Sequence, residues 1–171
     1  MNFKRGCYLV ITLGCIIFSA PSAFSELAPN STFDKIESLL GVWQATLPDG
    51  NKMDISYKEM NGGAILETYH SQDPMWWNMS SVYHKDNDRI LLSHYCSWGN
   101  HPRMNSKVGI VDNNNNTIDF KFVDLVENAP DKGHMHHLKI TFTDEDHISH
   151  QWIWREKGKD TPLTLTLERK P

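Results

Sequence analysis

The sequence predicts an all-β protein, an up-and-down antiparallel barrel of about ten strands that follows one short helix. From Gly41 to Pro171 the apolar residues alternate with polar ones, which is typical of strands with one buried face. Turn signals separate these segments at short intervals. Closely spaced antiparallel strands that share one apolar face must close or stack, so a two-sheet sandwich is the alternative to the barrel.

The first 25 residues are typical of a secretory signal peptide. A short basic region precedes an apolar run over residues 7–20, which is too short to span a membrane. Small residues lead up to Ser25, and we expect cleavage near Ser25 and Glu26. A lipoprotein anchored at Cys15 is the alternative, but Thr12 stands where a large aliphatic residue is expected.

Residues 26–171 are therefore the predicted mature chain, a secreted, periplasmic protein with a single barrel domain. Removal of the leader takes away two basic residues and no acidic one, which moves the formal net charge from −4 to −6. Nucleic acids and anionic membranes require a positive face, so neither is expected as a partner, and no later apolar run predicts a membrane span. Two of the three cysteines leave with the leader, so Cys96 has no intrachain disulfide partner.

The predicted helix covers STFDKIESLL, residues 31–40. Ser31 or Thr32 caps it, its apolar residues fall on one face, and Gly41 ends it. The turn signals that follow are PDGN at 48–51, NGG at 61–63, DND at 86–88, DNNNN at 112–116, DED at 144–146 and EKGKD at 156–160.

Three predicted strands show their inward face clearly, because apolar residues occupy every second position. These inward residues are Met53, Ile55 and Tyr57 in KMDISYK, Ile118, Phe120 and Phe122 in TIDFKFVD, and Leu163, Leu165 and Leu167 in PLTLTLER.

The start LLGVWQATLPDGNKMDISY resembles the calycin superfamily, which includes lipocalins, fatty-acid-binding proteins and nitrobindin-like barrels. The resemblance lies in a short helix that leads into Gly41-x-Trp43 and a first hairpin. It implies that Trp43 plugs the closed end of the barrel and that Arg169, on the last strand, lies across it. SHYCSWGNHPRM and HMHHLKITFTDEDHISHQWIW resemble strings of a secreted bacterial family of lipocalin-like domains without established function. This likeness spans most of residues 33–170.

Polar side chains on inward faces predict a small-molecule site. Leu138 faces inward, so alternation along the strand places His134 and His136 inside as well. We expect one end of the barrel interior to be polar, with imidazoles, and the other to be apolar, with indoles. An apolar interior with a few convergent polar groups suits a small, partly apolar ligand. The residues predicted to bind it are Tyr57, Trp76, Trp77, His94, Cys96, Arg103, Phe120, His134, His136, His150, Trp152 and Trp154.

HYCSWGNHPRM, residues 94–104, is predicted to end one strand and begin a loop. We expect His94 and Cys96 inside the barrel, either as ligand contacts or as ordinary core residues. The loop GNHPRM is expected to carry Arg103 to the barrel mouth, where it could receive an anion. Trp76 and Trp77 lie in a connection between strands, where they form a lid over the pocket or a patch for a partner protein, or simply pack on the barrel rim.

Metal and haem sites stay open as alternatives, and the cofactor is unknown. Imidazole and thiolate suit zinc or copper, although no spacing matches a metal signature. The resemblance to nitrobindin implies a haem held by a histidine of the last strand, and TPLTLTLERKP has none. The candidate metal ligands are His94, Cys96, His134 and His136, and a haem would need His94, His134 or His150 instead.

Enzyme chemistry is the other alternative, with a binding protein favoured over an enzyme. Cys96 as a nucleophile would need a base, and His94 lies two residues away, about 6 to 7 Å along the strand. Interior histidines such as His134 and His136 could serve an isomerase, cyclase or hydrolase. The ligand and the oligomeric state, monomer or dimer, are left open.

Overall fold

The computed structural model describes residues 32–71, 78–107, 116–126 and 133–171. Ten antiparallel strands close into one barrel with a single short helix among these residues, so the predicted fold class is confirmed. Within these ranges no helix is long and apolar enough to cross a membrane. The predicted signal peptide and the two tryptophans Trp76 and Trp77 lie outside the described residues.

The barrel elements follow one another in chain order. They are α1 (Thr32–Glu37), β1 (Gly41–Thr46), β2 (Lys52–Met60), β3 (Ala64–His70), β4 (Ser80–Asp86), β5 (Arg89–Tyr95), β6 (His101–Lys107), β7 (Thr117–Val126), β8 (His134–Phe142), β9 (His147–Glu156) and β10 (Lys159–Arg169).

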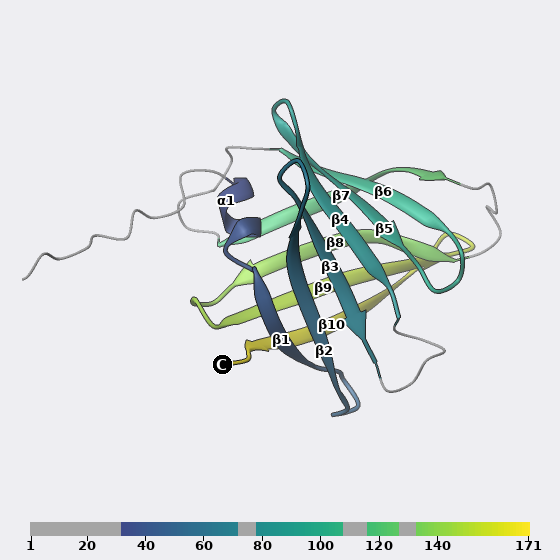
Figure 1. Ribbon diagram of the computed structural model, residues 1–171. Helices are drawn as coiled ribbons and strands as arrows, with labels where there is room; N and C mark the ends of the chain where they lie inside the picture. The colour runs from purple at the N-terminus through teal and green to yellow at the C-terminus, as the bar shows by residue number, and fades with distance from the viewer. Residues whose placement is uncertain (1–31, 72–77, 108–115, 127–132) are drawn as a thin grey trace, which may run out of the picture.

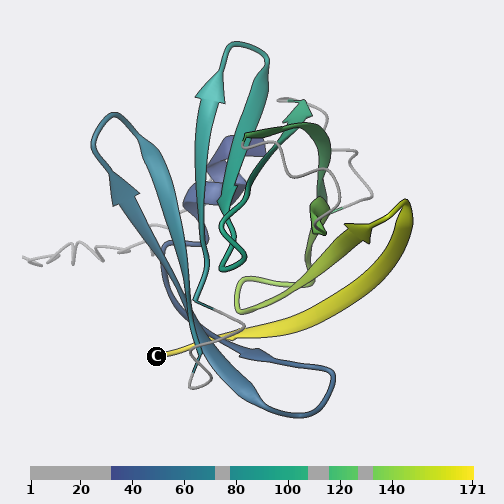
Figure 2. The same ribbon diagram turned by 90° about the vertical axis from the view of Figure 1, so that its right-hand side faces the viewer.

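Each strand pairs with the next one along the chain, and β1 closes the ring by pairing with β10 (Figure 1, Figure 2). In that closing ladder Trp43 lies opposite Arg169. A continuous ladder leaves no open sheet edge, which distinguishes the barrel from the sandwich alternative.

Helix α1 covers one end of the barrel. Phe33, Ile36 and Leu39 are buried in the same apolar core as Trp43. The ammonium group of Lys85, near the end of β4, lies 4.7 Å from the centre of the Phe33 ring. Figure 1 shows α1 at the end of the barrel away from the β9–β10 turn. The barrel is therefore covered at this end by its own apolar residues.

The predicted loop GNHPRM is mostly a strand, so this prediction is wrong. The turn after β5 is tight: the Gly99 amide donates to the Cys96 carbonyl at 2.9 Å, with Gly99 at a φ of 78° that favours glycine. Strand β6 then begins at His101, and Arg103 pairs in register with Ser93. The short turn leaves no loop that could carry Arg103 away from the sheet.

Candidate functional site: a buried polar layer beside His94

Glu67 lies at the centre of the polar groups inside the barrel. Its side chain, on β3, is fully buried. Tyr57 and Tyr69 donate hydrogen bonds to its Oε1 at 2.6 and 3.0 Å, and Tyr83 donates to its Oε2 at 2.8 Å. A buried carboxylate is costly unless donors replace its water, and three phenol groups supply them.

His150 reaches this cluster from the opposite wall, on β9. Its Nε2 lies 3.1 Å from the Tyr57 hydroxyl, and its Nδ1 lies 3.6 Å from Oε1 of Glu67. On the same strand Trp152 donates from Nε1 to the Tyr69 hydroxyl at 3.3 Å. Strands β2 and β3 are not neighbours of β9 in the ring, so these contacts cross the interior. We call Glu67, Tyr57, Tyr69, Tyr83 and His150 the polar layer.

The protons of the polar layer fix its hydrogen-bond directions. Tyr57 has one proton and gives it to Glu67, so its oxygen accepts from the Nε2–H of His150. Tyr69 also gives its proton to Glu67 and accepts from Trp152. The polar layer is therefore a connected network across the barrel.

Burial sets the protonation of these groups. It raises the pKa of all three phenols well above the usual value, and the charge of Glu67 raises it further. Burial also lowers the pKa of His150, which Glu67 partly opposes. The tyrosines are therefore neutral donors rather than bases, and the geometry suits a rigid hydrogen-bonded support.

His94 lies beside the polar layer with one nitrogen unused. Its side chain is fully buried, its Nδ1 lies 3.0 Å from the Ser81 hydroxyl, and its ring centre lies 4.9 Å from that of Trp152 across the interior. Among the described residues, Nε2 of His94 has no hydrogen-bond partner. Burial, with a smaller effect of His101, lowers the pKa of His94 to about 3, so the imidazole is neutral at physiological pH.

Cys96, the next inward residue on this chain segment, is buried as predicted. Burial raises the pKa of its thiol, which disfavours the thiolate that a nucleophile or a metal ligand requires. Within the described part of the chain no group of three or more His, Cys, Asp or Glu side chains is placed to hold a metal ion. The structure therefore does not bring the candidate metal ligands His94, Cys96, His134 and His136 together into a metal site.

The predicted alternation at the start of β8 does not hold. A bulge at His136 shifts the register, so that Met135 is the buried residue opposite Trp154. His134 lies opposite Arg155 instead, and both histidines are only half-buried. A single extra residue thus reverses the inward and outward positions that strict alternation predicts.

His134 and His136 form a small cluster with Phe122 and Arg155, which we call the histidine cluster. His136 stacks on Phe122 with ring centres 4.4 Å apart, and its Nδ1 lies 3.1 Å from Nε2 of His134. Arg155 can only donate, and it does so to Nε2 of His136 at 2.6 Å, which leaves the His136 proton on Nδ1. Partial burial and then Arg155 lower the pKa of His136. This cluster is therefore neutral apart from Arg155, which also pairs with Asp160.

The remaining residues that the sequence predicts to contact a ligand differ in how deeply they are buried. Phe120 and Trp152 are buried, whereas Trp154 is half-buried and contacts the exposed Trp98 at 5.9 Å between ring centres. Arg103 is exposed and forms an ion pair with Asp124, so it does not reach the interior. The expected separation into an imidazole end and an indole end is also wrong, because Tyr69 contacts both His150 and Trp152, and the His94 ring packs against Trp152.

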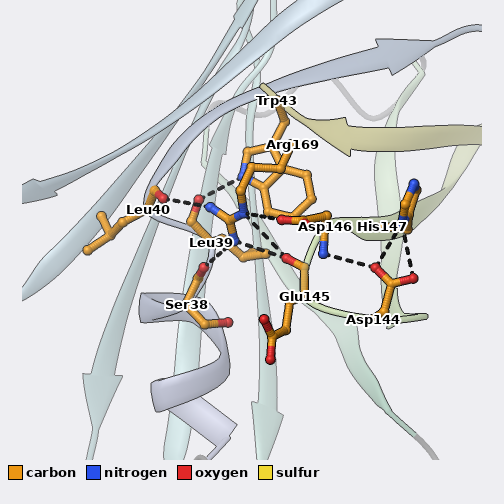
Figure 3. Close-up of polar contacts among 9 residues, drawn as sticks. All are labelled: Ser38, Leu39, Leu40, Trp43, Asp144, Glu145, Asp146, His147 and Arg169. Carbon is orange, nitrogen blue, oxygen red and sulfur yellow. Dashed lines mark hydrogen bonds and ion pairs between the residues drawn. The ribbon is translucent and has the colours of Figure 1, made fainter. Parts of the chain in front are cut away.

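Arg169 and Trp43 meet as the resemblance implies (Figure 3). The guanidinium carbon of Arg169 lies 4.3 Å from the centre of the Trp43 ring. Arg169 also donates to the carbonyls of Ser38 at 2.8 Å and Leu40 at 3.0 Å, which ties the last strand to the chain after α1. Gly41 has a φ of 126°, and a Cβ there would lie 3.4 Å from the guanidinium, so glycine suits both the backbone and this close approach.

The haem arrangement implied by the resemblance to nitrobindin does not fit these residues. The last strand places Leu165 and Leu167 in the core and carries no histidine. Both ring nitrogens of His150 face polar-layer groups. The His134 and His136 imidazoles face each other and Arg155. The last-strand arrangement is therefore absent, whereas Nε2 of His94, the third candidate, has no partner among the described residues. We derive no step through haem.

Together these features define a class: a closed ten-stranded antiparallel barrel whose interior carries an acidic residue surrounded by tyrosines. The crystal structure of Rv2717c from M. tuberculosis is similar, with a TM-score of 0.52, 15% sequence identity, and coverage of 85% of this chain and 100% of that chain. At this identity the likeness shows the fold. The sequence matches no family model and no curated protein. Membership of the calycin superfamily stays a prediction.

Proposed function

We propose that this chain is an exported, periplasmic barrel that binds a small, partly apolar molecule in its interior, next to His94. The observation that carries this proposal is the unused Nε2 of His94, fully buried beside Trp152. A buried polar atom without a partner costs about 1 to 3 kcal/mol, and a ligand that reaches Nε2 would recover that cost. The closed barrel is a fold that hosts ligands of this kind.

The two sides of His94 suit different parts of such a ligand. Nε2 offers one polar contact, and the indole of Trp152, which packs against the His94 ring with ring centres 4.9 Å apart, offers an apolar neighbour. The polar layer supports this wall, because Trp152 is held by Tyr69 and Tyr69 by Glu67. A pre-formed site of this kind lowers the cost of ordering on binding.

Fluorescence titration with 1-aminoanthracene, an uncharged apolar amine, tests this proposal. We expect saturable, one-to-one binding to residues 26–171, and a loss of about tenfold in affinity in His94→Phe, because phenylalanine fills the space without a polar contact. Arg89→Ala, which changes only an exposed ion pair with Asp86, is the matched control and should bind like the wild type. An absence of saturable binding, with the far-ultraviolet circular dichroism of a folded barrel, would contradict the proposal.

A further inference from the structure

We propose that the ligand beside His94 is an uncharged, flat aromatic molecule with one hydrogen-bonding group, and that carboxylates and other anions are excluded. This inference rests on the proposed function and adds the chemical class of the ligand. It follows from the charges inside the barrel and at its rim.

Among the described residues, the interior holds a buried carboxylate and no buried lysine or arginine beside it. Glu67 is fully buried in the polar layer. Of the lysines and arginines in the described residues, only Lys35 is buried, and it lies on α1, where its ammonium contacts Asn116 at 3.2 Å. A carboxylate ligand would therefore lie near the Glu67 carboxylate, with no buried lysine or arginine of the described strands to pair with it.

Arg155, beside the histidine cluster, and Arg103, on β6, are already paired. Arg155 makes a two-pronged ion pair with Asp160, with contacts of 2.6 and 2.8 Å. Arg103 makes a similar pair with Asp124 on the outer face. Arginine usually binds a carboxylate through such a two-pronged contact. In Arg155 and Arg103 the guanidinium already makes this contact with an aspartate of the same chain.

The polar contact that His94 offers is uncharged. Burial lowers the pKa of His94 to about 3, so a ligand meets a neutral imidazole at Nε2, the nitrogen that does not contact Ser81. A cationic ligand is not required either, because Glu67 receives hydrogen bonds from three tyrosines. The Trp152 indole packs against the His94 ring, so a ligand that reaches Nε2 meets an aromatic neighbour, and aromatic rings favour such neighbours through offset or edge contacts.

Two probes with the same ring test this inference: 2-naphthol, which is uncharged at pH 7.5, and 2-naphthoate, which is an anion. We expect isothermal titration calorimetry to show 2-naphthol binding at least about tenfold more tightly than 2-naphthoate, since an unpaired buried charge costs more than an unpaired neutral group. His94→Phe should weaken 2-naphthol by about tenfold. Glu67→Gln, which removes the interior charge and keeps the side-chain volume, should raise the affinity for 2-naphthoate.

The outcomes separate this inference from the proposed function. Binding of 2-naphthoate as tight as that of 2-naphthol, with both lost in His94→Phe, would overturn the charge inference and leave the proposed site in place. Binding of 2-naphthol that is unchanged in His94→Phe would overturn the assignment to His94. Binding of neither naphthol nor 1-aminoanthracene to the folded barrel would overturn both proposals.

Discussion

The polar layer and the Arg169 closure both tie distant strands together, but they do so at different depths. Arg169 lies at the covered end with 28% of its side chain exposed, and its donors go to backbone carbonyls and to Asp146. Glu67 is fully buried, and its partners are side chains. The comparison shows how burial decides the cost of a lost hydrogen bond. Water can replace a lost partner of a partly exposed charge, whereas a buried charge that loses a partner stays unsatisfied.

The largest effect should come from removal of Glu67. Glu67→Ala leaves three phenol groups buried without their acceptor, so we expect the free energy of unfolding to fall by about 3 to 5 kcal/mol. Urea denaturation followed by tryptophan fluorescence measures this loss. Glu67→Gln keeps one acceptor oxygen and should lose less, and equal losses in the two variants would contradict the role given to the carboxylate.

Acid should destabilise the barrel through His94. Its folded-state pKa of about 3 lies below the usual 6.5, so the unfolded chain binds the proton more readily. The stability is complete above pH 6.5 and is lost progressively as the pH falls toward 3, by about 2 kcal/mol between pH 6.5 and 5. The lowered pKa of His150 acts in the same direction. Urea midpoints measured across this range should fall less steeply in His94→Phe than in the wild type, and identical slopes would contradict the prediction.

Loss of the Arg169 closure should have a smaller effect. Arg169→Met keeps much of the apolar contact with Trp43 but removes the guanidinium and its hydrogen bonds, so we expect a loss of about 1 to 2 kcal/mol. Lys170→Met, one residue later, breaks only an exposed pair with Asp54 and is the control. Thermal unfolding compares the two variants. A loss in Arg169→Met as large as that in Glu67→Ala would break the proposed contrast between the two regions.

The smallest effect is expected at Arg103. Its pair with Asp124 is exposed on the outer face, and such pairs contribute little. Arg103→Ala should leave both the melting temperature and the binding of 2-naphthol unchanged. Weaker binding in this variant would return Arg103 to the ligand site that the sequence predicted for it.

Alternation along the strands was enough to predict the barrel and much of its core. It correctly placed Tyr57, Phe120 and Trp152 inside, because the apolar residues next to them on their strands occupy every second position. The contact between Arg169 and Trp43 came from the resemblance together with the phase of the last strand. Alternation failed at His136, because a bulge inserts a residue without any signal in the sequence.

The centre of the polar layer was missed for a different reason. In AILETYH, Glu67 has the same phase as Ile65 and Tyr69, and a carboxylate in phase with apolar residues signals a buried, partnered charge. Ser81 and Tyr83 share a phase in SSVYHKD and could be read in the same way. The approach of His150 to Glu67 could not be predicted, because it depends on which walls of the barrel face each other.

The most direct test of the central claim is a long-range proton–nitrogen NMR spectrum of the histidine side chains with and without 2-naphthol. We predict that the Nε2 signal of His94 moves on binding and that its Nδ1 signal, held by Ser81, moves less. The His150 signals should stay in place, since both nitrogens face polar-layer groups. An unmoved His94 Nε2 signal in the presence of saturating 2-naphthol would contradict the account.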